Sequence, residues 1–223
     1  MAEYNIAEKF ISINGEGTKA GQLSVFIRFK GCNLNCSYCD TKWANEPNTV
    51  AEVMTENNIY KYIKSSGIKN VTLTGGEPLI QKDIIILLEK LAADKALVVE
   101  IETNGSIDVT DVINIKANRP SLTMDYKLSS SGMENFMNTH NFELLEKKDT
   151  VKFVVGSASD LERAKQIIEN YRLTKKCNVY FSPVFGSIEP TEIVEYMIQS
   201  KLNGVNLQLQ MHKIIWSPDK RGV

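Results

Sequence analysis

Residues 23–41 read LSVFIRFKGCNLNCSYCDT, an apolar run that leads directly into a loop with three cysteines. The run 23–29 is rich in β-branched and aromatic residues and predicts a strand. Cys32, Cys36 and Cys39 follow with the spacing CxxxCxxC. The three thiols therefore lie at the carboxyl end of a strand, where parallel α/β folds place their functional sites.

Similar runs recur along the chain and alternate with segments of helical periodicity. Strands are predicted at 4–13, 23–29, 71–74, 97–101, 121–125, 151–155, 179–181 and 205–209, and helices at 50–66, 83–94, 159–171 and 191–200. Several strand runs are continuously apolar, which predicts strands buried on both faces. The alternation predicts parallel strands with helical crossovers. Because only seven strands follow the N-terminal segment 4–13, fewer than the eight of a closed barrel, we expect an α/β fold of the partial TIM-like barrel type.

Composition narrows the class of protein. The chain has 223 residues, with 26 Lys and Arg against 27 Asp and Glu. This balance and the lack of a basic stripe argue against direct nucleic-acid binding. No run approaches the ~20 apolar residues of a membrane span, and the charged start MAEYNIAEKF does not resemble a signal peptide. We expect a cytoplasmic protein with no membrane partner and a single domain over 1–223.

The cysteine loop predicts a metal site. Thiolates suit iron–sulfur clusters and zinc. A structural zinc site normally has four protein ligands, and the candidates for a fourth are Cys177, His140 and His212, each more than 100 positions away. A 4Fe–4S cluster on three cysteines would leave one iron open for a substrate or cofactor. Inert buried thiols and a non-catalytic zinc or iron–sulfur module are the alternatives, and Cys177 is interpreted as structural.

The loop resembles the signature of the radical S-adenosylmethionine (SAM) superfamily, in which an aromatic residue, here Tyr38, precedes the last cysteine. Three further segments resemble motifs of that superfamily: LTGGEP at 73–78, EIETNGS at 100–106 and DYK at 125–127. Each alone could be a turn or a solvated charge, but they occur in order at successive strand ends. The resemblance implies a radical SAM barrel with a 4Fe–4S cluster on Cys32, Cys36 and Cys39, bound SAM, and an electron donor such as flavodoxin or ferredoxin.

The resemblance also implies which residues contact the cofactor. These are Tyr38, Cys39, Asp40, Gly76, Glu77, Thr103, Asn104, Asp125, Tyr126, Lys127 and Ser182. In the family, glycines like Gly76 let the backbone approach, and the acidic residue matching Glu77 meets the amino group of SAM. DYK stands where many relatives have Ser-Pro-Lys. Only Lys127 matches that motif, so its implied role rests on a closer match than those of Asp125 and Tyr126. The match around Ser182 is loose.

Residues 10–41 closely resemble the opening of the 7-carboxy-7-deazaguanine synthase family. The resemblance implies a homodimeric lyase of queuosine and 7-deazapurine biosynthesis that contracts the ring of 6-carboxy-5,6,7,8-tetrahydropterin and releases ammonia. It implies Mg²⁺ on Thr41 and no catalytic side-chain nucleophile. The implied substrate contacts are Ile13, Asn14, Gly15, Glu16, Arg28, Thr74 and Val223.

Two of these contacts have a physical rationale of their own. A guanidinium binds a carboxylate in a bidentate fork, and Arg28 lies in an apolar run where an unpaired charge would be costly. The simpler alternative is a salt bridge between Glu16 and Arg28.

The tail, about 212–223, is expected to fold toward the active site because it contains apolar residues, although a frayed terminus is the alternative. Asn14 replaces a commoner Gln and is one methylene shorter.

The alternative enzyme is an activase that installs a glycyl radical on a partner protein. Such activases have a similar length and the same CxxxCxxC spacing. The segments INGEG and CDT argue against this alternative.

Overall fold

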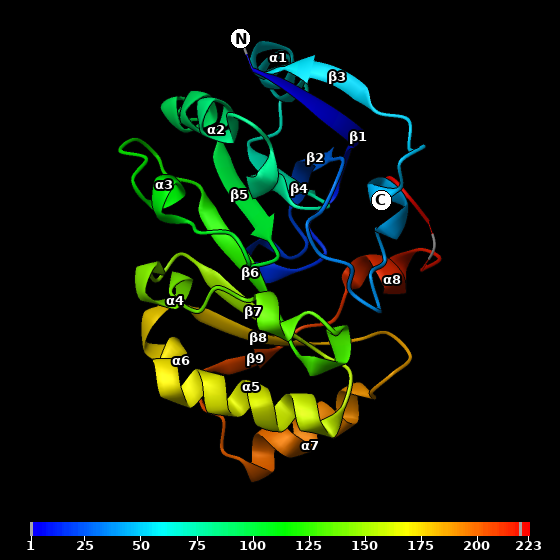
Figure 1. The fold of residues 1–223 in the computed structure, drawn as a ribbon, viewed down its shortest axis with the longest axis vertical. Helices are drawn as coiled ribbons and strands as arrows, with labels where there is room; N and C mark the ends of the chain where they lie inside the picture. Colours follow the sequence, from blue (N-terminus) through cyan, green and yellow to red (C-terminus); the bar gives the residue numbers. More distant parts are fainter. Residues whose placement is uncertain (1, 219) are drawn as a thin grey trace.

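The computed structural model describes residues 2–218 and 220–223. In these residues nine strands form one sheet, in the order β3-β1-β2-β4-β5-β6-β7-β8-β9 (Figure 1). β1 is antiparallel to β2 and β3, and the strands from β2 through β4 to β9 run parallel. The strands are β1 Glu3–Ile13, β2 Leu23–Phe29, β3 Glu52–Thr55, β4 Asn70–Gly75, β5 Val98–Thr103, β6 Ser121–Lys127, β7 Thr150–Val155, β8 Asn178–Pro183 and β9 Val205–Leu207.

Helices form most of the crossovers and confirm the predicted α/β class. They are α1 Glu56–Ser65, α2 Ile84–Ala93, α3 Thr110–Ile113, α4 Asn141–Leu144, α5 Ala158–Tyr171, α6 Leu173–Lys176, α7 Pro190–Gln199 and α8 Met211–Ile215. Edge strands β3 and β9 leave the sheet open, as expected of a partial barrel. None of the described helices is long and apolar enough to cross a membrane.

The segment 50–66 differs from its prediction as one helix. Residues Glu52–Thr55 form β3, which pairs antiparallel with β1, and α1 begins only at Glu56. Val53 and Thr55 are β-branched and suit an edge strand. The side chain of Thr55 accepts a hydrogen bond from the backbone N–H of Asn58 at 3.2 Å and caps the helix. Strand pairing and the cap therefore set a boundary that periodicity alone did not reveal.

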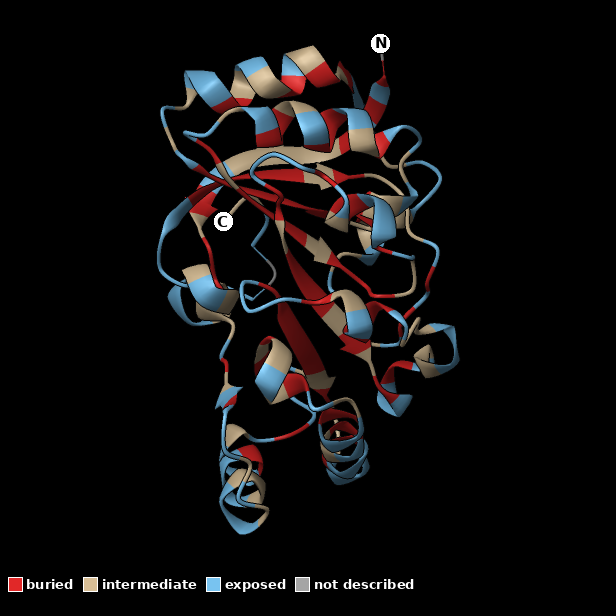
Figure 2. Cartoon of the chain, turned by 90° about the vertical axis from the view of Figure 1, so that its left-hand side faces the viewer, coloured by how far each residue is buried: buried red, intermediate tan, exposed pale blue. Residues whose placement is uncertain are grey.

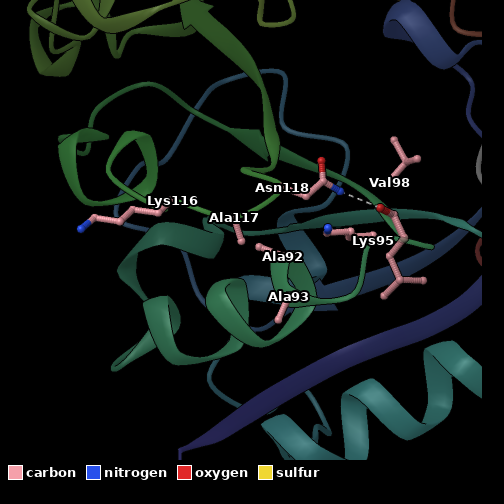
Figure 3. A pocket seen from close by; sticks show the side chains of 8 residues that line it. Ala92, Ala93, Lys95, Val98, Lys116, Ala117 and Asn118 are labelled. Atoms are coloured by element: carbon pink, nitrogen blue, oxygen red, sulfur yellow. Dashed lines mark hydrogen bonds between the residues drawn. The ribbon is translucent and has the colours of Figure 1, made fainter.

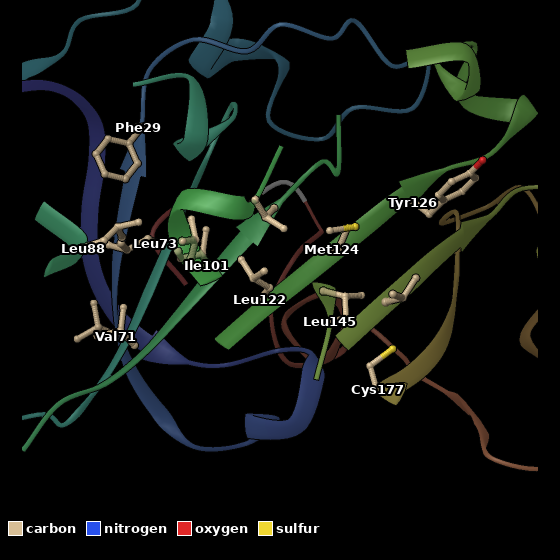
Figure 4. Close-up of a cluster of buried hydrophobic side chains, with 14 of the residues drawn as sticks. Phe29, Val71, Leu73, Leu88, Ile101, Leu122, Met124, Tyr126, Leu145 and Cys177 are labelled. Carbon is tan, nitrogen blue, oxygen red and sulfur yellow. The ribbon is translucent and has the colours of Figure 1, made fainter. Parts of the chain in front are cut away.

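The central strands are buried on both faces, as predicted, but the two faces differ in polarity. Val151, Phe153 and Val155 of β7 point outward into the core, while Lys152 between them points into the barrel. Figure 4 shows the outward side chains, among them Leu73 and Leu122, gathered as one apolar cluster. The inner face is buried but polar, which prepares it to hold a polar ligand.

Packing of helices on the outer face stabilises the barrel. In α2 the side chains of Leu87, Leu88 and Leu91 are fully buried against the sheet. Each such burial contributes about 1.5–3 kcal/mol. Figure 2 shows buried strands in the middle of the molecule and helices whose outward faces are exposed. The core therefore lies outside the barrel and does not depend on what the barrel holds.

Candidate functional site

The cysteine loop lies where the sequence predicts, directly after β2, and neighbouring loops hold it in place. The side chain of Asn33 donates to Ser106 Oγ at 2.8 Å, beyond the end of β5. The hydroxyl of Ser37 donates to the carbonyl of Ser130 at 2.7 Å, beyond the end of β6. The loop is thus tied to two further strand ends that also carry predicted cofactor contacts.

The three predicted cluster ligands lie near one another with free thiols. Cys36 is buried, and Cys32 and Cys39 are partly exposed. Burial raises the pKa of Cys32 and Cys36; the charge of Cys39 raises both further, and that of Cys32 also raises the pKa of Cys36. In the described residues no three His, Cys, Asp or Glu side chains converge tightly enough to hold a single metal ion. Because a structural zinc site normally has four protein ligands, three thiolates suit an iron–sulfur cluster better than zinc.

In the part of the chain that the structure describes, none of the alternative fourth zinc ligands forms a metal-binding group with the three cysteines. Cys177 is a buried core residue just before β8, at the amino end of the strands (Figure 4). His140 pairs with Glu143 on the surface beside α4. His212 lies against Gly15 in the C-terminal tail. The structural interpretation of Cys177 agrees with this placement.

The GGEP segment supports the cysteine loop through its backbone. Gly76 donates its N–H to the carbonyl of Phe29 at 3.1 Å, and Glu77 donates to the carbonyl of Gly31 at 2.9 Å. A Cβ added at Gly76 would lie 2.0 Å from the carbonyl oxygen of Gly31. The absence of a side chain therefore allows two backbones to meet; close approach at this glycine was expected, but its partner Gly31 was not.

Glu77 is a fully buried hydrogen-bond hub. Its carboxylate accepts from Thr103 Oγ1 at 2.8 Å, from the N–H of Asn104 at 2.6 Å and from the N–H of Leu79 at 3.0 Å. Burial raises its pKa to about 7 despite these donors. These bonds use about three of the four acceptor sites of a carboxylate, which leaves one on Oε2 for the predicted contact with the SAM amino group.

Asn104 links this hub to the predicted cluster. Its side-chain amide lies 3.6 Å from the sulfur of Cys32 and donates to Asn33 Oδ1 at 3.0 Å. Hydrogen bonds to cluster sulfurs are one means by which proteins set the reduction potential. Thr103 and Asn104 therefore lie beside the cysteine loop, as the predicted roles require.

The end of β6 places Asp125 and Lys127 inside the barrel, where their side chains pair at 3.1 Å. The charges of Lys127 and Lys152 outweigh burial and lower the pKa of Asp125. Tyr126 points the other way and packs between Phe142 and Phe153 in the outer core. Any contact of Tyr126 with a cofactor would therefore use its main chain.

Tyr38 lies close to this pair with a buried hydroxyl that has no hydrogen-bond partner in the described residues. Burial raises its pKa to about 12. Asp40 differs, because its side chain is 55% exposed and lies 3.6 Å from Lys213 of the tail. Tyr38 is thus the more buried of these two predicted contacts.

The loop after β1 enters the barrel and carries the predicted substrate contacts. Asn14 donates to Glu100 Oε2 at 3.1 Å. Glu16 pairs with Lys152 at 2.6 Å and accepts from Ser182 Oγ at 3.3 Å. Ile13 ends β1 opposite Leu23. The loop therefore presents two polar side chains to the interior.

Arg28 and Thr74 complete the predicted substrate set. Arg28 Nε pairs with Glu8 Oε2 at 3.1 Å. Because Arg28 pairs with Glu8 and Glu16 pairs with Lys152, the alternative salt bridge between Arg28 and Glu16 is wrong. Thr74 is buried on β4 beside Glu102, whose pKa is raised to about 7 by burial.

The C-terminal tail lies over the same end of the barrel. The N–H of Met211 donates to the carbonyl of Gly15 at 3.2 Å, and a Cβ added at Gly15 would lie 2.9 Å from His212 Nδ1. The guanidinium of Arg221 lies 4.1 Å from the ring centroid of Trp43. In Figure 1 the red tail with α8 lies beside the light-blue segment that follows β2.

The last residues of the tail lie near Glu8, the residue that pairs with Arg28. A Cβ added at Gly222 would be 3.8 Å from Glu8 Oε1, and Val223 follows directly with intermediate exposure. Asp219, within the predicted tail, and Met1, within the predicted single domain, lie outside the described residues. The tail contact and the domain boundaries therefore stay predictions.

The predicted Mg²⁺ ligand, Thr41, lies 3.7 Å from the sulfur of Cys39 through its hydroxyl. An oxygen ligand suits a hard cation.

A hollow elsewhere, at the amino end of β5, is lined by none of the predicted site residues (Figure 3). Its lining includes Ala92, Lys95 and Asn118.

Several inner-face charges were missed from the sequence: Glu8, Glu100, Glu102 and Lys152. Lys152 stands in the apolar run TVKFVV, just as Arg28 stands in VFIRF. An unpaired charge in a buried strand is as costly for Lys152 as for Arg28. The same sequence signal therefore pointed to Lys152.

Comparison with known proteins agrees with this geometry. A model of the radical SAM superfamily matches residues 26–143. The 7-carboxy-7-deazaguanine synthase of Clostridium acetobutylicum is 61% identical over 220 residues, covering 99% of each chain. That of Chlorobaculum tepidum is 39% identical over 225 residues, covering 100% of this chain and 98% of the relative. The crystal structure of QueE from Escherichia coli has the same fold, with a TM-score of 0.75 at 23% identity over 94% of this chain and 95% of that chain.

Proposed function

The chain belongs to the radical SAM superfamily and, within it, to the 7-carboxy-7-deazaguanine synthases, and from this premise we propose how its residues divide the work of the reaction. It is a radical SAM lyase with a 4Fe–4S cluster and SAM as cofactors. The reaction contracts 6-carboxy-5,6,7,8-tetrahydropterin to 7-carboxy-7-deazaguanine with release of ammonia, in queuosine biosynthesis. The 61% identity to a named synthase over nearly the whole chain carries this assignment.

On the cofactor side, Cys32, Cys36 and Cys39 would hold the cluster. When bound, the cluster and SAM supply the one-electron chemistry that starts a radical reaction. The Asn104 amide, 3.6 Å from Cys32, would donate to a cluster sulfur and adjust its potential. Lys127 lies near the charges of Cys36 and Asp125, where it would offset the negative charge of the site.

On the substrate side, the polar barrel interior would hold the pterin. Asn14 and Glu16 would hydrogen-bond its donor-rich edge, supported by their placement inside the barrel. Arg28 would bind its carboxylate, with Glu8 holding the guanidinium in orientation. Thr74, the residues Ile13 and Gly15 at the end of β1 and in the loop after it, and Val223 of the tail would complete the enclosure.

Exclusion of water falls to the tail. Its contacts with Gly15, Asp40 and Trp43 support a closed cover over the barrel mouth. A dry site strengthens each polar contact and protects reactive intermediates. Positioning is therefore the main contribution of this chain's residues.

Further features follow from the family alone. We propose Mg²⁺ at Thr41 beside the substrate, a homodimer, and a flavodoxin or ferredoxin as electron donor. The cytoplasmic setting stays a prediction from the sequence.

Product analysis tests the assignment. The reconstituted protein is incubated without oxygen with reductant, SAM, Mg²⁺ and 6-carboxytetrahydropterin, and the products are analysed by mass spectrometry. The wild type is expected to form 7-carboxy-7-deazaguanine, and Arg28→Ala to lower the rate about 100-fold because a half-buried charged contact is lost and Glu8 is left unpaired. Arg163→Ala, which removes an exposed arginine paired with Glu134, is the matched control.

The alternatives give different results in the same experiment. An activase would cleave SAM and leave the pterin unchanged. A binding module with one zinc per chain and no sulfide would yield neither product. Either result would overturn the proposed function.

A further inference from the structure

Lys152 lies in the middle of the barrel interior, between the loop after β1 and the end of β6. Its Nζ is 2.6 Å from Glu16 Oε2 and 2.9 Å from Asp125 Oδ1. The lysine side chain is only 8% exposed. An ammonium group held by two carboxylates away from water has one favourable position, so Lys152 is a fixed bridge between two loops.

The bridge is part of a longer polar chain across the barrel. At one end Ser182 donates to Glu16 at 3.3 Å, and at the other Asp125 pairs with Lys127 at 3.1 Å. The side chains of this polar network contact one another in the order Ser182, Glu16, Lys152, Asp125 and Lys127. Glu16 belongs to the proposed pterin contacts and Asp125 to the proposed SAM contacts, so Lys152 joins the two halves of the site.

Charge balance also depends on this lysine. Glu16, Glu102 and Asp125 lie around Lys152, and Glu16 and Asp125 pair with it directly. Without Lys152, Glu16 and Asp125 would lose the cation that lies between them in a buried space. Burial acts to lower the pKa of Lys152, but the three carboxylates outweigh it and hold the pKa well above its usual value.

We propose that Lys152 is a positioning residue that orients Glu16 for the pterin and couples pterin binding to SAM binding through Asp125. The inference rests on the proposed function. A neutral side chain at this position leaves Glu16 and Asp125 to repel each other and move independently. Because coupling between two sites is reciprocal, the same factor must appear in the affinity of either ligand.

Ligand binding to the unreduced holoenzyme tests the proposal, because no turnover occurs without electrons. Anaerobic calorimetry measures the Kd of 6-carboxytetrahydropterin with and without SAM, and the ratio of the two values is the coupling factor. In the wild type this factor is expected to be roughly 5-fold or more. In Lys152→Met it is expected to fall to about 1, with the pterin Kd raised about 10-fold or more.

Two further variants separate this role from a general loss of structure. Lys152→Arg keeps the charge and is expected to restore part of the coupling. Lys148→Met removes a lysine that bonds the carbonyl of Arg119 just before the same strand, and it is expected to behave as the wild type. If Lys152→Met gives no folded holoenzyme, Asp125→Asn takes its place, because it cuts the bridge on the SAM side and is expected to abolish the coupling factor.

The outcomes distinguish the two proposals. A wild type that binds SAM but not the pterin overturns the proposed function and this inference with it. A wild type that binds both without coupling, or a Lys152→Met protein with wild-type coupling, overturns the inference alone. Loss of coupling in Lys152→Met or Asp125→Asn, with Lys148→Met unaffected, supports it.

Discussion

Glu77 is a residue whose ionisation opposes folding. It is fully buried, and burial raises its pKa from 4.5 to about 7 although Thr103, Asn104 and Leu79 donate to it. A folded-state pKa above the unfolded value means that the folded protein binds the proton more tightly. The stabilisation is present below pH 4.5 and is lost as the pH rises toward 7.

A pH series of unfolding measurements tests this. Between pH 5 and pH 8 the free energy of unfolding of the wild type is expected to fall by about 2 kcal/mol more than that of Glu77→Gln, at about 1.4 kcal/mol per unit of pKa shift. Glu77→Gln is expected to be less stable at every pH, because an amide NH₂ would face backbone donors. Glu89→Gln on the exposed face of α2 is the control. If the free energy of unfolding changed with pH equally in Glu77→Gln and the wild type, ionisation of Glu77 would not be the cause of the pH dependence.

At this scale the sequence predicted the identity of site residues better than their roles. The three cysteines and Asn104 lie together at the strand ends, as their motifs require. Close approach at Gly76 was expected, but its partner within the protein, the carbonyl of Gly31 in the cysteine loop, could not be read from the sequence because it depends on the fold. The partner of Arg28 was also hidden, since Glu8 lies on an antiparallel neighbour whose register depends on the fold.

At the scale of elements, one cation–π pair links the end of the tail to the segment after the cysteine loop. Arg221 lies 4.1 Å from the centroid of the Trp43 ring, in the loop that follows the cysteines. Such a cation–π pair contributes about 0.5–2 kcal/mol. The pair ties closure of the tail to the loop that carries the predicted cluster ligands.

Loss of that pair is expected to loosen the cover. Arg221→Ala is expected to raise the KM for the pterin roughly 2- to 30-fold, the equivalent of 0.5–2 kcal/mol, with a smaller effect on kcat. Trp43→Leu is expected to give a similar change, and the double variant no more than either alone. Steady-state kinetics measure these values, and Lys220→Ala is the neighbouring control. Additive effects of the two substitutions would contradict a direct pair.

Among the elements, the long helices were predictable and the short ones were not. α2 and α5 follow their hydrophobic periodicity and begin within one residue of the predicted positions. The four-residue β3 was hidden within a predicted helix, since it is stabilised by pairing with β1 far back in the sequence. Elements that derive their stability from distant partners leave a weak local signal.

At the scale of the whole molecule, the apolar core and the site occupy opposite faces of one sheet. The core includes Leu73, Leu122 and Phe153 on the outer face, under the helices. The polar interior and the cysteine loop lie inside and at the carboxyl ends of the strands. Alternation along each strand creates this division, which explains why a charged interior coexists with a stable fold.

This division predicts that the fold survives without the cluster. Replacing Cys32, Cys36 and Cys39 together with Ala is expected to abolish iron, sulfide and product, while far-UV circular dichroism stays as in the wild type, because the cysteines lie outside the main core cluster. Cys177→Ser is expected to destabilise the fold without loss of iron or sulfide. Cys177 belongs to the core at 5% exposure, and burying a hydroxyl there costs about 1–3 kcal/mol while iron and sulfide are retained. A triple variant that is unfolded would instead make the cysteine loop part of the folding core, and the separation of stability from chemistry across the sheet would not hold.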